Sequence, residues 1–393
     1  MSTLALPSPA GRTTAFELFG APPHDVERIA TPEPLPSLDA AVVSAEEALE
    51  RHEYAQAIRA LEGLPLAASP QLALRGLLAE AWARMSLGKL DAALDVLERA
   101  RVLADDAQFG DADRAAVLYR IGCCRFNLAS IANAVALFTL ALELCDRSGE
   151  SCDALRARIL QWRSRCYQRR REWEAARADV EQALELATGI GDEWAIAYAH
   201  FQASLIAERE GQWLVARMYA EEAKERYESL GDRLYVHKLL NNLGGIHFLL
   251  GKPEAAATCL KDAFRIALEL EDDIGAAYAM SSLAQVQLKS GEPVEAEAHA
   301  RRALELLDER LDHVEEIGNA QLVLGRCFLE QSRHDEAEHL FRIAESQFER
   351  SSSPSQRCAA WIAQGDLALR RGDKDHAAAL YRQAAESLQD FHF

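Results

Sequence analysis

An arginine-rich stretch between Arg156 and Arg177 holds eight arginines and two glutamates. Within it, Arg158, Arg165 and Arg169 recur at spacings of seven and four residues, which puts them on one face of a helix. Guanidinium groups bind oxyanions through paired hydrogen bonds, so this face could anchor an acidic side chain, a terminal carboxylate or a phosphate. The alternative is that these arginines pair with acidic residues of neighbouring segments, which is a common role of surface charges.

No other motif in the sequence favours catalysis. The chain contains no P-loop, dinucleotide-binding glycine turn, HExxH or GxSxG pattern. Glu336 and His339 share a helix face, but His334 falls in the expected turn before them, which disfavours a metal site. Cys123 and Cys124 are adjacent and point to different faces of a helix, which disfavours a redox pair. We therefore expect no catalytic residue, no metal, no cofactor and no enzymatic activity.

The composition limits the possible partners. The 393 residues carry a formal net charge of −19 at pH 7, which argues against nucleic acid and anionic membrane surfaces as direct partners. No apolar run is long enough to span a bilayer, and the N-terminal residues lack the features of a signal peptide. The eight cysteines are scattered and form no CxxC pair, as in a reduced protein. These features predict a cytoplasmic protein.

Two amphipathic helices with a tight turn between them are expected from Leu239 to Leu270. Gly251 ends the first helix, because glycine adopts positive φ without strain. Pro253 begins the second helix, where its missing N–H has no cost. This hairpin pattern recurs along nearly the whole chain.

Alanine recurs five residues after each expected turn, at intervals of 36 to 42 residues. These positions are Ala57, Ala93, Ala134, Ala176, Ala216, Ala256, Ala296, Ala337 and Ala377. A second alanine follows seven residues later in eight of the nine units, and from the second unit on another small residue precedes each turn by seven. Small side chains let two helices approach closely, and a fixed period of this length indicates a solenoid.

This pattern of small residue, turn, alanine, large apolar residue and alanine resembles the tetratricopeptide repeat superfamily from Leu38 to the end of the chain. The period of about 40 is similar to the long repeats of kinesin light chains, cell-polarity adaptors and peptide-sensing bacterial transcription regulators. The superfamily's usual proline at the end of the second helix is missing, and Asp192, Asp232 and Asp272 stand between repeats, where they can cap the next helix. The resemblance implies an all-α, right-handed superhelical solenoid of about nine antiparallel hairpins, with first helices lining its concave face.

The expected domains are a Pro-rich, disordered tail over residues 1–37 and a repeat array over residues 38–393. The repeat units are expected at residues 38–66, 71–105, 111–148, 151–190, 193–230, 234–271, 274–310, 313–350 and 355–391. The tail contains a short apolar cluster at Phe16, Leu18 and Phe19, which is either a docking motif or a chance grouping. The tail is too short and too rich in proline for a DNA-binding domain.

Basic, amide and aromatic residues predominate at the positions of the first helices that would face the groove, and acidic residues are scarce there. These candidate peptide-binding residues are Tyr119, Arg120, Asn127, Arg158, Gln161, Trp162, Arg165, Arg169, Tyr198, Phe201, Gln202, Lys238, Asn241, Asn242, Tyr278, Gln285, Asn319 and Arg326, with Ser282 and Lys289 beside them. Amides can pair with a peptide backbone, and aromatic rings supply contact area. For Asn241 and Asn242, a role in packing is an equal alternative.

These observations predict a non-enzymatic scaffold that binds an extended, acidic or carboxylate-bearing segment of a protein or peptide. The alternative is a regulatory or sensor component of a bacterial transcription or signalling system that acts through a partner. Phe391 and Phe393 lie at the end of the last unit, where they either fold back or form a homodimer contact.

Overall fold

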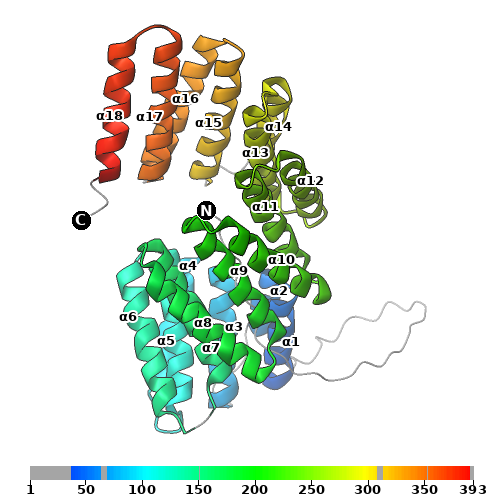
Figure 1. The fold of residues 1–393 in the computed structure, drawn as a ribbon. Helices are drawn as coiled ribbons and strands as arrows, with labels where there is room; N and C mark the ends of the chain where they lie inside the picture. The colour runs from blue at the N-terminus through cyan, green and yellow to red at the C-terminus, as the bar shows by residue number, and fades with distance from the viewer. Residues whose placement is uncertain (1–36, 63–68, 150, 308–312, 352, 390–393) are drawn as a thin grey trace, which may run out of the picture. The chain divides into compact units, whose positions relative to one another are not determined.

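The computed structural model of the protein describes residues 37–62, 69–149, 151–307, 313–351 and 353–389. Over these ranges the chain forms helices and short turns and contains no strand. The helices are α1 (Leu38–Glu50), α2 (Tyr54–Leu61), α3 (Pro70–Ser86), α4 (Leu90–Ala104), α5 (Asp111–Asn127), α6 (Ile131–Arg147), α7 (Asp153–Arg169), α8 (Trp173–Ile190), α9 (Glu193–Arg209), α10 (Trp213–Ser229), α11 (Arg233–Leu249), α12 (Pro253–Glu269), α13 (Asp273–Lys289), α14 (Pro293–Leu307), α15 (Val314–Glu330), α16 (His334–Arg350), α17 (Pro354–Arg370) and α18 (Lys374–Gln389). The prediction of an all-α fold of repeated helical hairpins is confirmed (Figure 1).

The chain divides into two compact units, Met1–Ile206 and Ala207–Phe393, with the boundary inside α9. In the N-terminal unit the first helices of successive hairpins pack in the order α3, α5, α7. In the C-terminal unit they pack in the order α11, α13, α15, α17. Each unit therefore has a face built only from first helices. The expected tail over residues 1–37, with its apolar cluster, and the final phenylalanines lie outside the described residues, Ser37 excepted.

The turns follow the local signals in the sequence. Gly251 has a φ of +71°, and Pro253 begins α12, as the sequence predicts. The three aspartates between repeats each cap a first helix by accepting a hydrogen bond from a backbone N–H three residues on. The donors are Ala195 N to Asp192 at 3.0 Å, Tyr235 N to Asp232 at 3.2 Å and Gly275 N to Asp272 at 2.9 Å. These caps satisfy N–H groups that the start of a helix leaves free.

The recurring small residues are the points of closest helix contact. All nine of the first alanines have 0% exposure. A Cβ atom on Gly244 would lie 2.6 Å from Cγ of Leu260, and one on Gly122 would lie 2.6 Å from a ring carbon of Phe138. Where the first helix has glycine at this position, the large residue of the second helix therefore occupies the space that the glycine leaves. This confirms the close approach inferred from the sequence.

Two adjacent glycines in α11 are expected to respond oppositely to alanine. Gly244→Ala should lower the free energy of unfolding by about 1–3 kcal/mol, because the new methyl group collides with the buried Leu260 side chain. Gly245→Ala should raise it by about 0.5–1 kcal/mol, because this exposed helical position has open space around a Cβ. Chemical denaturation followed by circular dichroism measures both changes. Shifts of the same sign would contradict the packing described here.

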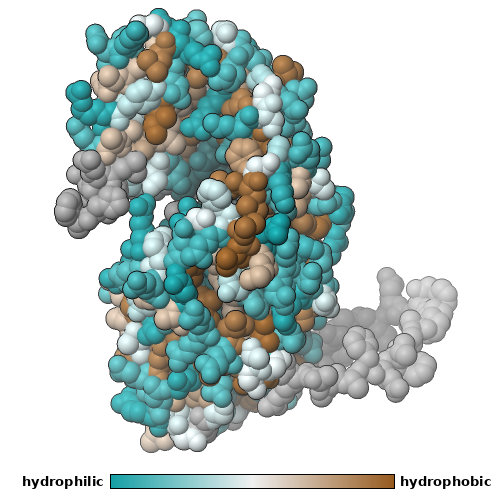
Figure 2. Space-filling model, in the orientation of Figure 1, coloured by the Kyte–Doolittle hydropathy of each residue, from teal (hydrophilic) through white to brown (hydrophobic). Residues whose placement is uncertain are grey.

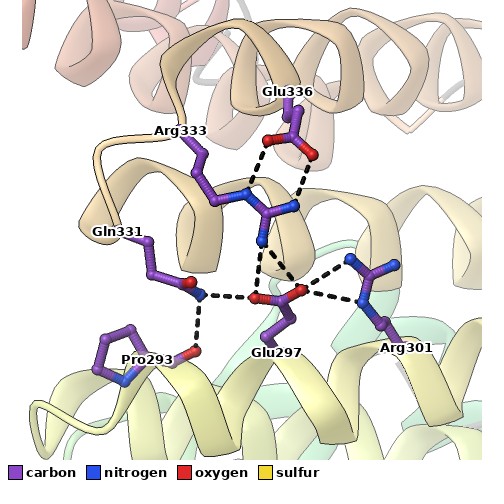
Figure 3. Close-up of polar contacts among 6 residues, drawn as sticks. All are labelled: Pro293, Glu297, Arg301, Gln331, Arg333 and Glu336. Carbon is purple, nitrogen blue, oxygen red and sulfur yellow. Dashed lines mark hydrogen bonds and ion pairs between the residues drawn. The ribbon is translucent and has the colours of Figure 1, made fainter.

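Second helices of neighbouring repeats are joined by a network centred on Glu297 of α14 (Figure 3). Its carboxylate accepts hydrogen bonds from Gln331 at 2.7 Å, Arg333 at 3.0 Å and Arg301 at 2.7 Å. Arg333 also binds Glu336 at the start of α16 and lies 3.8 Å from the ring centre of Phe328. Burial alone would raise the pKa of Glu297, but these hydrogen bonds together lower it below its ordinary value of 4.5.

The lowered pKa gives the Glu297 network a defined pH dependence. Its stabilisation is fully present above about pH 4.5 and is lost as the pH falls through the folded-state pKa of Glu297. We expect Glu297→Gln to lower the free energy of unfolding by about 1–2 kcal/mol at neutral pH. The difference from wild type should shrink at about pH 3, where both side chains are uncharged.

Glu305→Gln on the same helix is the control for this measurement. Glu305 binds Arg302 at 2.9 Å, but both side chains are about half exposed. Its loss should therefore change the free energy of unfolding by less than about 0.5 kcal/mol at any pH. An equal effect of the two substitutions would contradict the assignment.

Hydrophilic residues cover most of the face drawn in Figure 2, with smaller hydrophobic groups among them. None of the described helices has the length and apolar content that a membrane span requires.

Candidate functional site

A pocket of about 640 Å³ lies on the first helices of the C-terminal unit. We call it the C-terminal pocket. Side chains of α11, α13, α15 and α17, with Leu260 of α12, form its walls. Its lining residues are Gly245, Phe248, Leu260, Ser282, Gln285, Val286, Leu288, Lys289, Arg326, Leu329, Glu330, Ile362, Asp366, Leu369 and Arg370.

The repeat period builds this pocket from equivalent positions. Gly245, Gln285, Arg326 and Asp366 lie at intervals of 40, 41 and 40 residues, one on each of the four first helices. A Cβ atom on Gly245 would meet nothing within 4 Å, so this glycine leaves the wall of the pocket open at α11. The equivalent position in four successive repeats therefore presents four different chemical groups to the same pocket.

Charged groups in the C-terminal pocket are partly compensated. Arg370 forms an ion pair with Glu330 at 3.1 Å, and Asp366 accepts a hydrogen bond from the Tyr381 hydroxyl at 2.6 Å. Arg326 and Lys289 form no ion pair with any described residue. Burial lowers the pKa of the Arg326 guanidinium, and the charge of Asp366 opposes that shift.

Apolar side chains lie beside these charges. Ile362 is 38% exposed and Leu369 is 47% exposed, and both line the C-terminal pocket. Such a combination of apolar contact area and a few polar groups is typical of ligand-binding sites.

Four of the residues predicted for the groove of the C-terminal unit line this pocket, namely Ser282, Gln285, Lys289 and Arg326. The remaining predicted residues of this unit are not part of its lining. The ammonium group of Lys238 lies 5.3 Å from the ring centre of Tyr235, and Asn319 is half-buried. The Tyr278 hydroxyl donates to Glu316 at 2.7 Å.

Asn241 and Asn242 are half-buried on α11. Within the described part of the chain, Oδ1 of Asn241 and Nδ2 of Asn242 are buried and have no hydrogen-bond partner. Buried polar atoms without partners are uncommon in folded proteins. These two amide atoms therefore do not serve the internal packing of α11 through a hydrogen bond within the described residues.

Six predicted groove residues of the N-terminal unit are buried instead of lying on an open surface. They are Tyr119, Gln161, Trp162, Tyr198, Phe201 and Gln202, each at most 2% exposed. The first helices pack tightly enough for Gln161 to donate to Ala195 O at 2.9 Å and for Gln202 to donate to Gln161 O at 3.0 Å. These side chains join α5, α7 and α9, so the expectation that they face a ligand directly needs correction.

The predicted arginines of the N-terminal unit lie against its aromatic residues. The Cζ atom of Arg120 lies 3.9 Å from the ring centre of Trp82, and that of Arg165 lies 4.0 Å from the ring centre of Trp162. Arg165 also lies over Phe126, at 4.5 Å. Arg158 is half-buried. We call Arg120, Arg158 and Arg165 the arginine cluster.

Two predicted residues lie outside the arginine cluster. Arg169 is exposed at the end of α7, with its Cζ atom 5.6 Å from the ring centre of Phe126. Asn127 is exposed, and its amide donates to Cys123 O of its own helix at 3.0 Å.

The arginines of the stretch from Arg156 to Arg177 differ in whether they form ion pairs. Arg156 pairs with Asp146, Arg163 with Asp179 and Arg170 with Glu172. Arg158, Arg165 and Arg169 form no ion pair with a residue that the structure describes, and neither does Arg120. Internal pairing thus accounts for part of the stretch and leaves the predicted face uncompensated.

Both sites contain residues that the sequence did not predict. Trp82 belongs to the second hairpin, and Ile362, Asp366, Leu369 and Arg370 belong to the ninth. The repeat period was the available signal for Asp366, which lies 40 residues after Arg326 at the equivalent position of the next unit.

A metal site has no support among the described residues, which contain no group of three His, Cys, Asp or Glu side chains able to hold an ion.

Comparison with known proteins identifies structures that share this fold. Residues 235–309 match the tetratricopeptide repeat family. A Rap protein complexed with competence and sporulation factor aligns with a TM-score of 0.67 at 16% identity, over 90% of this chain and 98% of that one. Residues 235–309 therefore carry tetratricopeptide repeats, and the chain as a whole has the helical repeat fold of that Rap protein.

Other solved structures share this helical repeat fold. The apo form of the quorum sensor NprR from B. thuringiensis aligns with a TM-score of 0.63 at 14% identity, over 89% of this chain and 98% of that one. The Rap conjugation gene regulator of plasmid pLS20, in complex with a Phr peptide, aligns with a TM-score of 0.59 at 13% identity, over 91% and 96%. No curated protein sequence matches the chain. At these identities the similarity concerns the fold alone.

Proposed function

We propose that this helical repeat protein binds an extended peptide, or the tail of a partner protein, and acts by binding and not by catalysis. The observation that carries the proposal is the C-terminal pocket, which four successive first helices line with apolar and polar side chains. Its volume of about 640 Å³ lies in the range of ligand-binding sites. Asn241 and Asn242 supply unpaired amide atoms on α11, which suit a peptide backbone.

The charges favour a ligand with an acidic or carboxylate-bearing segment. In the C-terminal pocket Glu330 is already paired with Arg370, whereas Lys289 and Arg326 have no ion-pair partner among the described residues. A carboxylate on the ligand would compensate these two cations.

A role as a regulatory or sensor component is the second candidate. Its support comes from the fold neighbours, which include a quorum sensor and a conjugation gene regulator in complex with a Phr peptide. In such a role the peptide would change how this protein engages its partner protein. The described cysteines are all free thiols, which supports a cytoplasmic location.

A homodimer formed through the last hairpin has less support. None of the α18 side chains that the structure describes is an exposed large hydrophobic residue. Light scattering of the full chain measures the oligomeric state, and a monomer at every concentration would exclude the homodimer.

Filling the C-terminal pocket should abolish peptide binding. Peptides that bind the immobilised full chain are first selected from a random library. Calorimetry then measures their affinity for the wild type and for Gly245→Trp. Because the new ring enters open space at the pocket wall, we expect affinity to fall at least about 10-fold.

Gly189→Trp is the matched control for this substitution. Gly189 also lies in a helix, is exposed and has nothing within 4 Å of a Cβ, but it belongs to the second helix α8. This variant should bind like the wild type. Failure to enrich any peptide, or unchanged affinity of Gly245→Trp, would contradict the proposed function.

A further inference from the structure

The arginine cluster and the tryptophan rings that it contacts come from three first helices of the N-terminal unit. Trp82 of α3 and Trp162 of α7 meet edge to face, with their ring centres 6.4 Å apart. Arg120 of α5 lies over the first ring and Arg165 of α7 lies over the second. The two guanidinium groups are thus brought to adjacent aromatic surfaces, which hold planar cations in a fixed orientation.

These cations have no counter-charge in an ion pair among the described residues, and they are partly or fully buried. Arg165 is only 7% exposed, and its Nη1 atom is buried with no hydrogen-bond partner among the described residues. The Nη2 atom of Arg158 is in the same state. A buried charge normally has a paired and hydrogen-bonded partner, because desolvation is costly. Contact with an aromatic face offsets only part of this cost.

The Trp162 indole N–H lies beside these cations and is buried with no partner among the described residues. Burial lowers the pKa of the Arg120 guanidinium, and the positive charge of Arg158 lowers it further. Arg120 and Arg165 lie near each other, because the Trp82 and Trp162 rings that they cover are in contact. What these groups lack is an anionic hydrogen-bond acceptor.

We propose that Arg120, Arg158 and Arg165 form a binding site for an oxyanion, either a carboxylate or a phosphate group. Guanidinium forks match the oxygen spacing of both groups, and a neutral ligand would leave the charges uncompensated. The site lies on helices that do not line the C-terminal pocket, so it goes beyond the proposed function and does not rest on it.

Calorimetric titration of the full chain at constant ionic strength tests this site. One arm uses inorganic phosphate, and the other compares a short acetylated peptide bearing a free terminal carboxylate with its terminal amide. We expect saturable binding of at least one oxyanion and at least about 10-fold weaker binding by Arg165→Gln or Arg158→Gln. Phosphate binding alone would assign a phosphate group, and preference for the free acid over the amide would assign a carboxylate.

Arg156→Gln is the matched control, because Arg156 lies on the same helix and already pairs with Asp146. It should bind the oxyanion like the wild type. If Arg165→Gln fails to fold by circular dichroism, the half-buried Arg158→Gln carries the comparison. No binding of either anion below about 10 mM, or equal weakening by Arg156→Gln, would overturn the proposal. Loss of peptide binding in Gly245→Trp with intact phosphate binding would separate the two sites.

Discussion

Arg165→Glu is expected to abolish oxyanion binding, with an affinity loss of at least about 100-fold, while the fold is kept. The substitution places a carboxylate near Arg120, because the tryptophan rings that the two arginines cover are in contact. The new side chain would take the place of the missing anion and pair with the remaining cations. The thermal midpoint should therefore stay equal or rise, although a charge has been reversed at a position only 7% exposed.

Stability and binding must be measured on the same Arg165→Glu preparation, by thermal denaturation and by phosphate titration. The control is Arg156→Glu, which removes an existing ion pair to Asp146 on the same helix. That variant should bind the anion like the wild type. Strong destabilisation of Arg165→Glu with retained anion binding would contradict the arginine cluster as a site.

Asp179→Ala is expected to lower the free energy of unfolding by about 3–5 kcal/mol, because it leaves a buried cation without its partner. Asp179 accepts two hydrogen bonds from Arg163, at 2.7 and 2.8 Å, and its side chain is 7% exposed. Arg163 also donates to Thr139 at 3.2 Å, so the group ties α7 to both α8 and α6.

Denaturation curves of two further variants separate the cost of an unpaired charge from that of lost packing. Arg163→Met combined with Asp179→Leu removes both charges and should recover most of the loss. Glu172→Ala breaks the exposed Arg170–Glu172 pair and should cost less than about 1 kcal/mol. A small effect of Asp179→Ala would show that this ion pair does not support the repeat.

The repeat framework was predictable from sequence because its contacts are local and periodic. Helix approach at Gly244 and Ala256 depends on residues within one hairpin, so the same spacing returns in every copy. The turn at Gly251 and the cap at Asp272 likewise follow from single residues.

The burial of individual side chains was not predictable in the same way. Trp162 and Phe201 were correctly assigned to first helices, yet both have 0% exposure. Counting back from a turn identifies the face of a helix, whereas burial depends on how closely the next first helix packs. That distance is set by residues of a different hairpin.

The arginine-rich stretch shows the same limit. Its sequence left internal pairing and ligand binding open, because both predict the same spacing of Arg158 and Arg165. The structure separates them by showing which carboxylates the neighbouring helices bring within reach, as Asp179 reaches Arg163.

Amide hydrogen exchange of the full chain, with and without a peptide selected for binding, tests the central claim most directly. If the first helices form the binding face, exchange should slow in α11, α13, α15 and α17, with little change in α14, α16 and α18. The Gly245→Trp variant should lose this protection. Protection confined to the second helices, or identical protection in Gly245→Trp, would contradict peptide binding at the C-terminal pocket.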